Sequence, residues 1–201
     1  MKDAVIGRVL LASLHQGIAD VLPMRLGFYE EWLNAKGLRD GSIGLGPVSA
    51  VLSFLRQEGE PYDVIMTRAG TYAAEWTVET MSPFHRRIVH AMPMWLRARW
   101  LLRLTRRLVH DTCQTSHAVS RIRRGVARVD VRGSLFCSVR EPVGRPLCRF
   151  YVSAFTRLLE QFDLTPEVIV VECRGTGHQH CVLTIALTPD LTSREPEARA
   201  A

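Results

Sequence analysis

The chain has 201 residues, of which 47% are hydrophobic and 23% are charged, and its formal net charge is +6 at pH 7. These values are ordinary for a globular protein and exclude a fibrous or low-complexity chain. The length suits one domain with a sizeable core. A moderately basic chain can meet nucleic acid, an anionic membrane or an acidic ligand, but its charge alone requires none of these partners.

The N-terminus and the cysteine usage indicate a compartment. The first residues do not match a signal peptide, because Arg8 interrupts their short apolar run. The sequence contains no run of about 18 apolar residues, so no membrane span is expected. Five cysteines without a secretion signal indicate a reducing cytoplasm, in which thiols are free or bound to a metal.

The first part of the chain has the hydrophobic spacing of helices. Amphipathic helices are predicted over residues 3–22 and 26–34, and the glycine-rich stretch GLRDGSIGLG that follows is predicted to be a loop. Pro47 is expected in the first turn of the next helix, where its missing N–H does no harm. The N-terminal part is therefore predicted to be all helical.

A long helix is predicted over residues 62–80, and Ser82 and Pro83 are expected to end it. Within this helix a group of small residues would let a neighbouring helix approach closely. The group consists of Ala69, Gly70, Ala73 and Ala74.

The next helix is predicted over residues 94–110 and has two different faces. Its apolar residues gather on one side, and the opposite side is the most basic surface of the chain. The basic residues are Arg99, Arg103, Arg106 and Arg107. They could meet phosphates or anionic lipid headgroups, or they could form a solvated helix face. No helix-turn-helix pattern accompanies them, so sequence-specific binding of nucleic acid is not expected.

From Ser116 onwards the pattern changes from helical to alternating. SHAVSRIRRG and VARVDVRG predict two strands around Gly125. A helix is predicted from Cys148, and EVIVVEC and CVLTIAL then predict a hairpin whose turn contains Gly175 and Gly177. Helices followed by a β-β-α-β-β segment indicate the α+β class. We predict one domain over residues 1–187, with its core motif over 113–187, and a flexible polar tail over 188–201.

Four of the five cysteines lie in the C-terminal motif: Cys137, Cys148, Cys173 and Cys181. Because side chains alternate in a strand, Ile169, Val171 and Cys173 are expected on one side of the first hairpin strand. Both hairpin cysteines should then lie at the mouth of the turn, near Cys148 in the first helical turn. These sulfurs could bind a metal, most naturally zinc, or be buried free thiols that pack as small hydrophobes. A disulfide is a further alternative.

This segment resembles the 4-vinyl reductase domain family. The resemblance rests on PLC (146–148), on VEC followed after seven residues by Cys181, and on Gly177 in the turn. SLFC (134–137) resembles the strand that precedes the family's helix, and RIVHAMPMWLRARWLLRLTRRL resembles the variety found in bacteriochlorophyll biosynthesis. The family resembles the TRAPP tethering-complex subunits in fold. The resemblance implies helices packed on a four-stranded antiparallel sheet, an apolar pocket, and a homodimer formed through the N-terminal helices.

The resemblance also implies metal ligands. The phenol-sensing members bind zinc with cysteines at the positions of Cys148, Cys173 and Cys181, and with a glutamate where this chain has Val170. We predict His178 as the fourth ligand, and Cys137 is the alternative that could replace the glutamate equally easily. Less direct substitutes are Glu167, Glu172 and His180. Cys113 is expected to be an ordinary buried thiol.

The implied pocket is mostly apolar. The predicted ligand-binding residues are Trp76, Trp95, Trp100, His110, Phe136, Tyr151 and Phe155. Each of them could equally be packed core, and His110 could simply cap a helix end. The bacteriochlorophyll-pathway variety implies a tetrapyrrole or another large hydrophobic ligand, whereas the phenol sensors imply a small aromatic one.

We therefore predict a domain that binds a hydrophobic small molecule and acts as a carrier or sensor for a separate signalling or biosynthetic protein. The alternatives are an auxiliary or catalytic protein of (bacterio)chlorophyll 4-vinyl reduction, and an interaction scaffold of the TRAPP type. Binding is favoured over catalysis, because vinyl reduction needs a hydride source and the sequence has no strand–GxGxxG–helix nucleotide motif.

Overall fold

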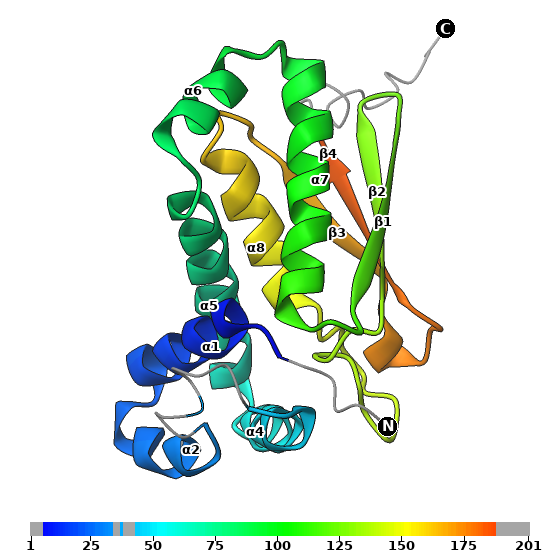
Figure 1. Cartoon of the computed structure of the whole chain (residues 1–201). Helices are drawn as coiled ribbons and strands as arrows, with labels where there is room; N and C mark the ends of the chain where they lie inside the picture. Colours follow the sequence, from blue (N-terminus) through cyan, green and yellow to red (C-terminus); the bar gives the residue numbers. More distant parts are fainter. Residues whose placement is uncertain (1–5, 34–36, 38–42, 188–201) are drawn as a thin grey trace, which may run out of the picture.

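A computed structural model describes residues 6–33, 37 and 43–187 (Figure 1). Helices pack on a four-stranded antiparallel sheet with the strand order β1-β2-β4-β3, which confirms the predicted α+β class and the β-β-α-β-β segment. The elements in chain order are α1 (Arg8–Val21), η1 (Pro23–Arg25), α2 (Leu26–Trp32), α4 (Leu45–Gln57), α5 (Glu60–Glu79), α6 (Pro83–Ala91), α7 (Met94–Thr112), β1 (His117–Arg123), β2 (Val126–Arg132), α8 (Arg149–Glu160), β3 (Glu167–Glu172), η2 (Arg174–Thr176) and β4 (Cys181–Ala186). Among these helices, none combines the length and the hydropathy needed to cross a bilayer.

Helix α5 runs alongside both α1 and α8, and its small residues allow the close approach that the sequence predicts. The contact is tightest at Gly70. A Cβ atom at this position would lie 2.4 Å from the carbonyl oxygen of Phe150 and 2.0 Å from Oγ of Ser153. Only glycine fits here without moving the α8 backbone, so α5 and α8 pack closely at this point.

Helix α6 is absent from the sequence prediction, although its start signal is present. Ser82 and Pro83 do end α5, as expected, but the same pair begins a new helix. The Ser82 hydroxyl accepts a hydrogen bond from the backbone N–H of His85 (3.3 Å), and Pro83 occupies the first turn. A serine–proline pair can thus end one helix and also provide the N-cap of the next. The sequence prediction considered only the end of the first helix.

The other helix boundaries differ less. Helix α1 begins at Arg8 rather than at residue 3, because Ile6 forms an isolated bridge with Cys113. Residues 38–42 of the predicted GLRDGSIGLG loop, and the predicted tail over 188–201, lie outside the described residues, and the last two residues of that stretch, Leu45 and Gly46, belong to α4. Helix α4 begins at Leu45, so Pro47 is in its first turn, as predicted.

The sheet presents one face to the helices. On β2 the residues that point inward are fully buried: Ala127, Val129 and Val131. Strands β1 and β2 pair from His117↔Arg132 to Arg123↔Val126 around the turn that contains Gly125, as predicted. Helix α7 packs across β1, and α8 packs against β3, on the same side of the sheet (Figure 1).

Strand β3 contains an irregularity that the sequence pattern did not reveal. Its register with β4 shifts between Val170 and Glu172. As a result Ile169 and Val171 are 51% and 52% exposed, whereas Cys173 is 1% exposed. The expectation that these three residues share one side is wrong, because a β-bulge adds a residue and changes the alternation. The bulge turns Cys173 into the interior.

Candidate metal centre

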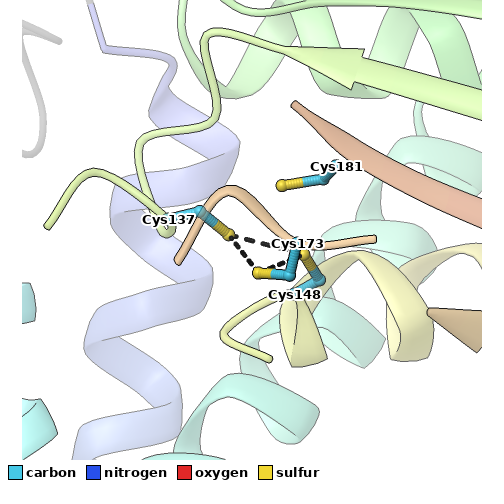
Figure 2. A group of neighbouring side chains, drawn as sticks. All are labelled: Cys137, Cys148, Cys173 and Cys181. Atoms are coloured by element: carbon cyan, nitrogen blue, oxygen red, sulfur yellow. Dashed lines mark hydrogen bonds between the residues drawn. The ribbon is translucent and has the colours of Figure 1, made fainter. Parts of the chain in front are cut away.

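Four cysteines from separate segments meet at one end of the sheet (Figure 2). Cys137 lies in the turn after β2, and Cys148 is the N-cap residue of α8. Cys173 directly follows β3, and Cys181 is the first residue of β4. The group therefore joins the β2–α8 connection, the start of α8 and both strands of the last hairpin, and we call it the four-cysteine cluster.

The four sulfur atoms all lie within 4.8 Å of one another. Sγ of Cys148 is 3.4 Å from that of Cys137 and 3.3 Å from that of Cys173, and the Cys137–Cys173 distance is 3.5 Å. A disulfide bond would be about 2.05 Å long, and all five cysteines are free. Four sulfurs at about 2.3 Å from a tetrahedral zinc ion would be about 3.8 Å apart. The spacing thus fits a metal and excludes a disulfide.

The surroundings of the cluster are closed and contain hydrogen-bond donors. Each of its four cysteines is no more than 1% exposed. The backbone N–H of Leu147 donates to Sγ of Cys173 (3.3 Å), and that of Arg174 donates to Sγ of Cys181 (3.4 Å). Donors of this kind stabilise a thiolate more than a thiol. At Gly175 a Cβ atom would lie 3.0 Å from Leu147 and 3.5 Å from the Cys173 sulfur, so this turn closes tightly over the site.

The thiols influence one another's ionisation. The hydrogen bonds that Cys148 shares with Cys137 and then Cys173, together with burial, raise the pKa of the Cys148 thiol. Hydrogen bonds from Cys137 and Cys148 lower the pKa of Cys173, and the Leu147 N–H adds to this effect. The pKa of the Cys181 thiol is lowered, and the hydrogen bond with Cys137 contributes most to this change. A divalent cation would favour the thiolate at all four positions, because it neutralises the charge that they otherwise share.

The ligand chemistry favours a structural metal. Thiolate ligands select zinc, copper(I) or iron, and a tetrahedral set of four sulfurs is typical of zinc or iron–sulfur sites. Four protein ligands leave no position open for water or substrate, which is the arrangement of structural rather than catalytic zinc. The cluster can therefore hold a metal ion, and chemistry on a substrate is not what this geometry provides.

The structure brings together the three cysteines that the sequence analysis selected, and the fourth member is Cys137. His178, the predicted fourth ligand, is exposed in the turn and lies outside the group. Of the other substitutes, His180 faces Asp130 (3.3 Å) and Glu172 faces Arg128 (3.8 Å). The sequence signal for Cys137 was its place in SLFC, read as a strand; the structure has a turn there instead.

The fifth cysteine has a different setting. Cys113 is 1% exposed and lies at the end of α7, where it bridges Ile6. Its sulfur is 3.1 Å from Oγ1 of Thr115 and is outside the four-cysteine cluster. Cys113 is thus the ordinary buried thiol that the sequence predicts, and it provides a matched control for the cluster.

The predicted ligand-binding residues do not line one common cavity. Phe136, Tyr151 and Phe155 are fully buried and pack on one another, with Phe136 and Tyr151 edge to face at 5.2 Å between ring centroids. Trp95 is 59% exposed, and His110 is exposed on α7. These residues belong to the core or to the surface, where no shared ligand could touch them all.

The two remaining tryptophans differ in a useful way. Trp76 is half-buried and stacks on Tyr72, with 5.6 Å between ring centroids. Trp100 lines a cleft of about 430 Å³ between α1, α5, α6 and α7. The residues around this cleft are Val9, Thr77, Thr80, Met81, Ser82, His85, Trp100, Leu104, Arg107 and Asp111. Among the predicted residues, Trp100 therefore lines this cleft, and His110 lines two more open hollows of about 420 and 370 Å³.

No family model and no curated protein matches the chain. Solved structures do match it. The Fe(II) unliganded H-NOX protein from K. algicida superposes with a TM-score of 0.56 at 11% identity, covering 92% of this chain and 98% of that chain. The H-NOX protein from S. oneidensis in the Fe(II)NO ligation state gives 0.52 at 13% identity, covering 91% and 99%. This likeness shows an H-NOX-like fold.

A further match is to the phenol-responsive sensory domain of the transcription activator PoxR, solved with phenol. It has 15% identity and covers 90% of this chain and 74% of that chain, but its TM-score of 0.41 is too low to establish a common fold.

Proposed function

We propose that this chain is a metal-braced domain that binds a hydrophobic small molecule and acts as a carrier or sensor. The observation that carries the proposal is the four-cysteine cluster, in which four buried sulfurs lie within 4.8 Å of one another. Buried thiols have no need to converge from four segments merely to fill space. Their convergence is what a closed tetrahedral site requires.

Zinc bound by Cys137, Cys148, Cys173 and Cys181 would cross-link the layers of the fold. The bound ion supplies charge neutralisation and four metal–sulfur bonds. The protein supplies the backbone N–H donors of Leu147 and Arg174 and excludes water from the sulfurs. The result would be a fixed angle between α8 and the last hairpin, which positions the helices that α8 contacts.

The ligand site that we propose is the cleft beside Trp100. Its volume of about 430 Å³ falls within the range of about 300–1,000 Å³ that is usual for small-molecule sites. Met81, Leu104 and Trp100 give it apolar walls, and His85, Arg107 and Asp111 give it polar groups that could orient a ligand. The resemblance to the 4-vinyl reductase domain family supports an aromatic or tetrapyrrole ligand. The most specific function that it supports is that of an auxiliary or catalytic protein in (bacterio)chlorophyll 4-vinyl reduction.

A scaffold without an exchanging ligand remains the second candidate, because one observation favours it. The aromatic interior beside the cluster is filled: Phe136 and Phe150 stack with 4.4 Å between centroids, and Tyr151 closes the group. A domain whose interior is already packed could present only its surface to a partner. The same family resemblance supports a cytoplasmic homodimer formed through the N-terminal helices, where Met24 is 96% exposed and Phe28 is 46% exposed.

The test is native mass spectrometry with metal analysis of the same purified sample. We expect one zinc per chain, the stoichiometry of a single closed site, and an additional organic mass. Cys137→Ser should lose the metal, whereas the control Cys113→Ser should keep it. Trp100→Ala should lose the organic mass, whereas Trp76→Ala should retain it.

The two parts of the proposal can fail separately. Metal-free protein, or equal metal content in Cys137→Ser and Cys113→Ser, would overturn the metal centre. One metal per chain without any organic mass, even after incubation with phenol or a porphyrin, would favour the scaffold.

A further inference from the structure

The corner between α6 and α7 concentrates positive charge. Residues 80–110 contain seven arginines and three histidines but no aspartate or glutamate. One of the arginines, Arg97, donates hydrogen bonds to backbone carbonyl oxygens of the protein, and the other six are exposed. The exposed ones are Arg86, Arg87, Arg99, Arg103, Arg106 and Arg107. Helices α6 and α7 meet at one end of the molecule, and the turn of the last hairpin lies at the opposite end (Figure 1).

The same corner exposes large apolar side chains. On α6, Phe84 is 70% exposed and Ile88 is 39% exposed; these residues are four apart and so lie on one side of the helix. At the start of α7, Met94, Trp95 and Leu96 are 52%, 59% and 38% exposed. Single exposed apolar residues are normal, but five large ones on two adjoining helices are a group of the kind that usually marks an interaction site, and we call these five residues the apolar patch.

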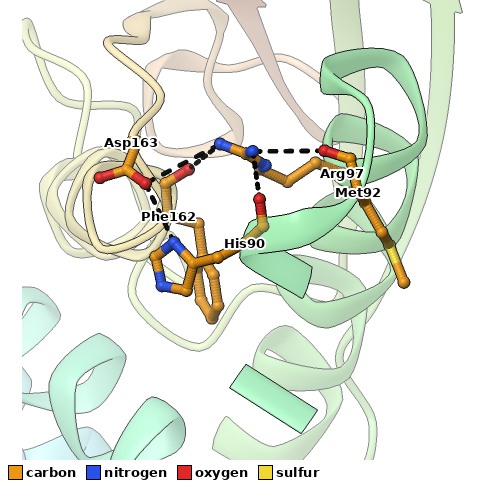
Figure 3. Close-up of polar contacts among 5 residues, drawn as sticks. All are labelled: His90, Met92, Arg97, Phe162 and Asp163. Atoms are coloured by element: carbon orange, nitrogen blue, oxygen red, sulfur yellow. Dashed lines mark hydrogen bonds and ion pairs between the residues drawn. The ribbon is translucent and has the colours of Figure 1, made fainter. Parts of the chain in front are cut away.

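The corner is held in shape by Arg97 (Figure 3). Its guanidinium donates to the carbonyl oxygens of His90 (2.5 Å) and Met92 (3.2 Å), at the end of α6, and to that of Phe162 (3.1 Å), beyond α8. Asp163, the nearby acidic residue, is paired with His90 at 2.9 Å. The apolar patch is therefore presented by a fixed turn and not by a loose loop.

The arginines continue from this patch along the outer face of α7. The guanidinium carbon of Arg99 lies 5.5 Å from the centre of the Trp95 ring, so charge and apolar surface are in direct contact. Arg103 and Arg106 line two neighbouring grooves between α7 and β1, of about 420 and 300 Å³.

We propose that the α6–α7 corner docks the protein on an anionic lipid bilayer. Phe84, Ile88 and Trp95 would enter the region between headgroups and acyl chains, and the arginines of α7 would meet lipid phosphates. Helices that lie on membranes combine these two features, an apolar side with tryptophan or phenylalanine and a basic side. A nucleic acid would satisfy the arginines alone and would leave the exposed apolar residues in water, so the bilayer fits both halves of the surface.

The experiment is sedimentation of the full chain with vesicles of phosphatidylcholine alone, and with vesicles that also contain phosphatidylglycerol. We expect binding only to the anionic vesicles, and weaker binding as salt rises. Arg99→Glu combined with Arg103→Glu should reduce the partition coefficient by more than about tenfold, since each basic residue near such a surface contributes substantially. Phe84→Ala combined with Trp95→Ala should reduce it about fivefold, because less apolar area is inserted.

Two control pairs match these changes on another surface. Arg121→Glu with Arg123→Glu makes the same charge change on the exposed side of β1, and Ile169→Ala with Val171→Ala removes two exposed apolar side chains, smaller than Phe84 and Trp95, from β3. Both control pairs should bind vesicles like the unchanged protein. All variants alter exposed residues, and a circular dichroism melt verifies that each is folded; a charge variant that melts early is replaced by Arg99→Gln with Arg103→Gln.

Failure to sediment with anionic vesicles would overturn the proposal. So would binding that the Phe84/Trp95 pair leaves unchanged and that heparin competes for fully, since that result describes a site for soluble polyanions. The outcome is independent of the metal and of the small-molecule ligand, because neither the four-cysteine cluster nor the Trp100 side chain is altered.

Discussion

The four-cysteine cluster and the α6–α7 corner differ in the burial of their key side chains. In the cluster, residues that are far apart in sequence come together and are removed from water. In the corner, residues that are close in sequence remain in water, although several of them are large and apolar. The four-cysteine cluster therefore depends on the complete fold, whereas the α6–α7 corner depends on two helices and on Arg97.

This difference separates stability from surface function. Buried contacts between distant segments stabilise the fold, so their loss should lower the free energy of unfolding. Exposed apolar residues contribute little to stability, and a group of large ones usually marks an interaction site. Substitutions at the two sites should therefore affect different measurements.

The largest effect is expected at the cluster. Cys148→Ser removes one of the four sulfurs of the proposed metal site and leaves three buried thiols that cannot complete it. Structural zinc contributes on the order of 10 kcal/mol to small metal-dependent folds, so we expect a loss of more than about 3 kcal/mol of unfolding free energy here. Urea titrations monitored by circular dichroism measure it, and a chelator should reproduce it in the unchanged protein.

Cys113→Ser is the matched control, because it also places a hydroxyl at a buried cysteine. Thr115 is available to it as a hydrogen-bond partner. We expect a cost of about 1–2 kcal/mol, with no dependence on chelator. If the two variants melt alike, the cluster is only packed core and the contrast between the two sites disappears.

A second large effect is expected where α8 meets α5 without any metal. Gly70→Ala would place a Cβ atom against the backbone of Phe150, which cannot move alone. Overpacking of this kind costs about 1–3 kcal/mol. Gly46→Ala in α4 meets nothing within 4 Å and should be neutral or stabilising by less than about 1 kcal/mol. Thermal melts of both variants show whether α8 is held by packing as well as by the cluster.

How much of this could be predicted from the sequence depends on the range of the interactions. The apolar stripes of α1, α5, α7 and α8 and the strands β1, β2 and β4 follow local periodicity, and the structure confirms them. The α+β class follows from their order. Helix α6 was missed, although Ser82 and Pro83 announce it, because the same two residues also end α5.

The site was predicted less completely, for a physical reason. Cys148, Cys173 and Cys181 could be grouped because a helix start and a hairpin place them by local rules. Cys137 reaches the cluster through a turn and a long connection, and no periodicity fixes where such a segment runs. No sequence pattern predicts the bulge near Val171 either, although this bulge turns Cys173 inward. The predicted ligand-binding residues scatter for the same reason, since aromatic residues serve core, surface and cleft alike.

A smaller effect on stability is expected at the corner. Arg97→Ala removes the donor to the carbonyl oxygens of His90, Met92 and Phe162, and it also removes a longer ion pair with Asp163 (3.9 Å). We expect a loss of about 2 kcal/mol and weaker vesicle binding, because the apolar patch is no longer held in one arrangement. Arg87→Ala, at an exposed position of α6, should change stability by less than about 0.5 kcal/mol. Equal melting of the two variants would show that the turn needs no clamp.

The smallest effect concerns acid sensitivity in the N-terminal helices, which belong to neither site. The Tyr29 hydroxyl donates to Glu58 (2.8 Å), and this bond, followed by contacts with Arg25, holds the pKa of Glu58 below its usual range. The folded state therefore binds a proton at Glu58 less readily than the unfolded state does. The resulting stabilisation is complete well above pH 4.3 and declines as the pH falls towards the folded-state pKa.

Glu58→Gln should accordingly cost about 1 kcal/mol at neutral pH, and the difference from the unchanged protein should shrink between about pH 5 and pH 3. Urea titrations across this range measure the difference. A difference that grows in acid would mean that the carboxylate is not the group responsible. A constant difference would mean that Glu58 acts through packing, and the acid sensitivity of the fold would then have to come from elsewhere in the described chain.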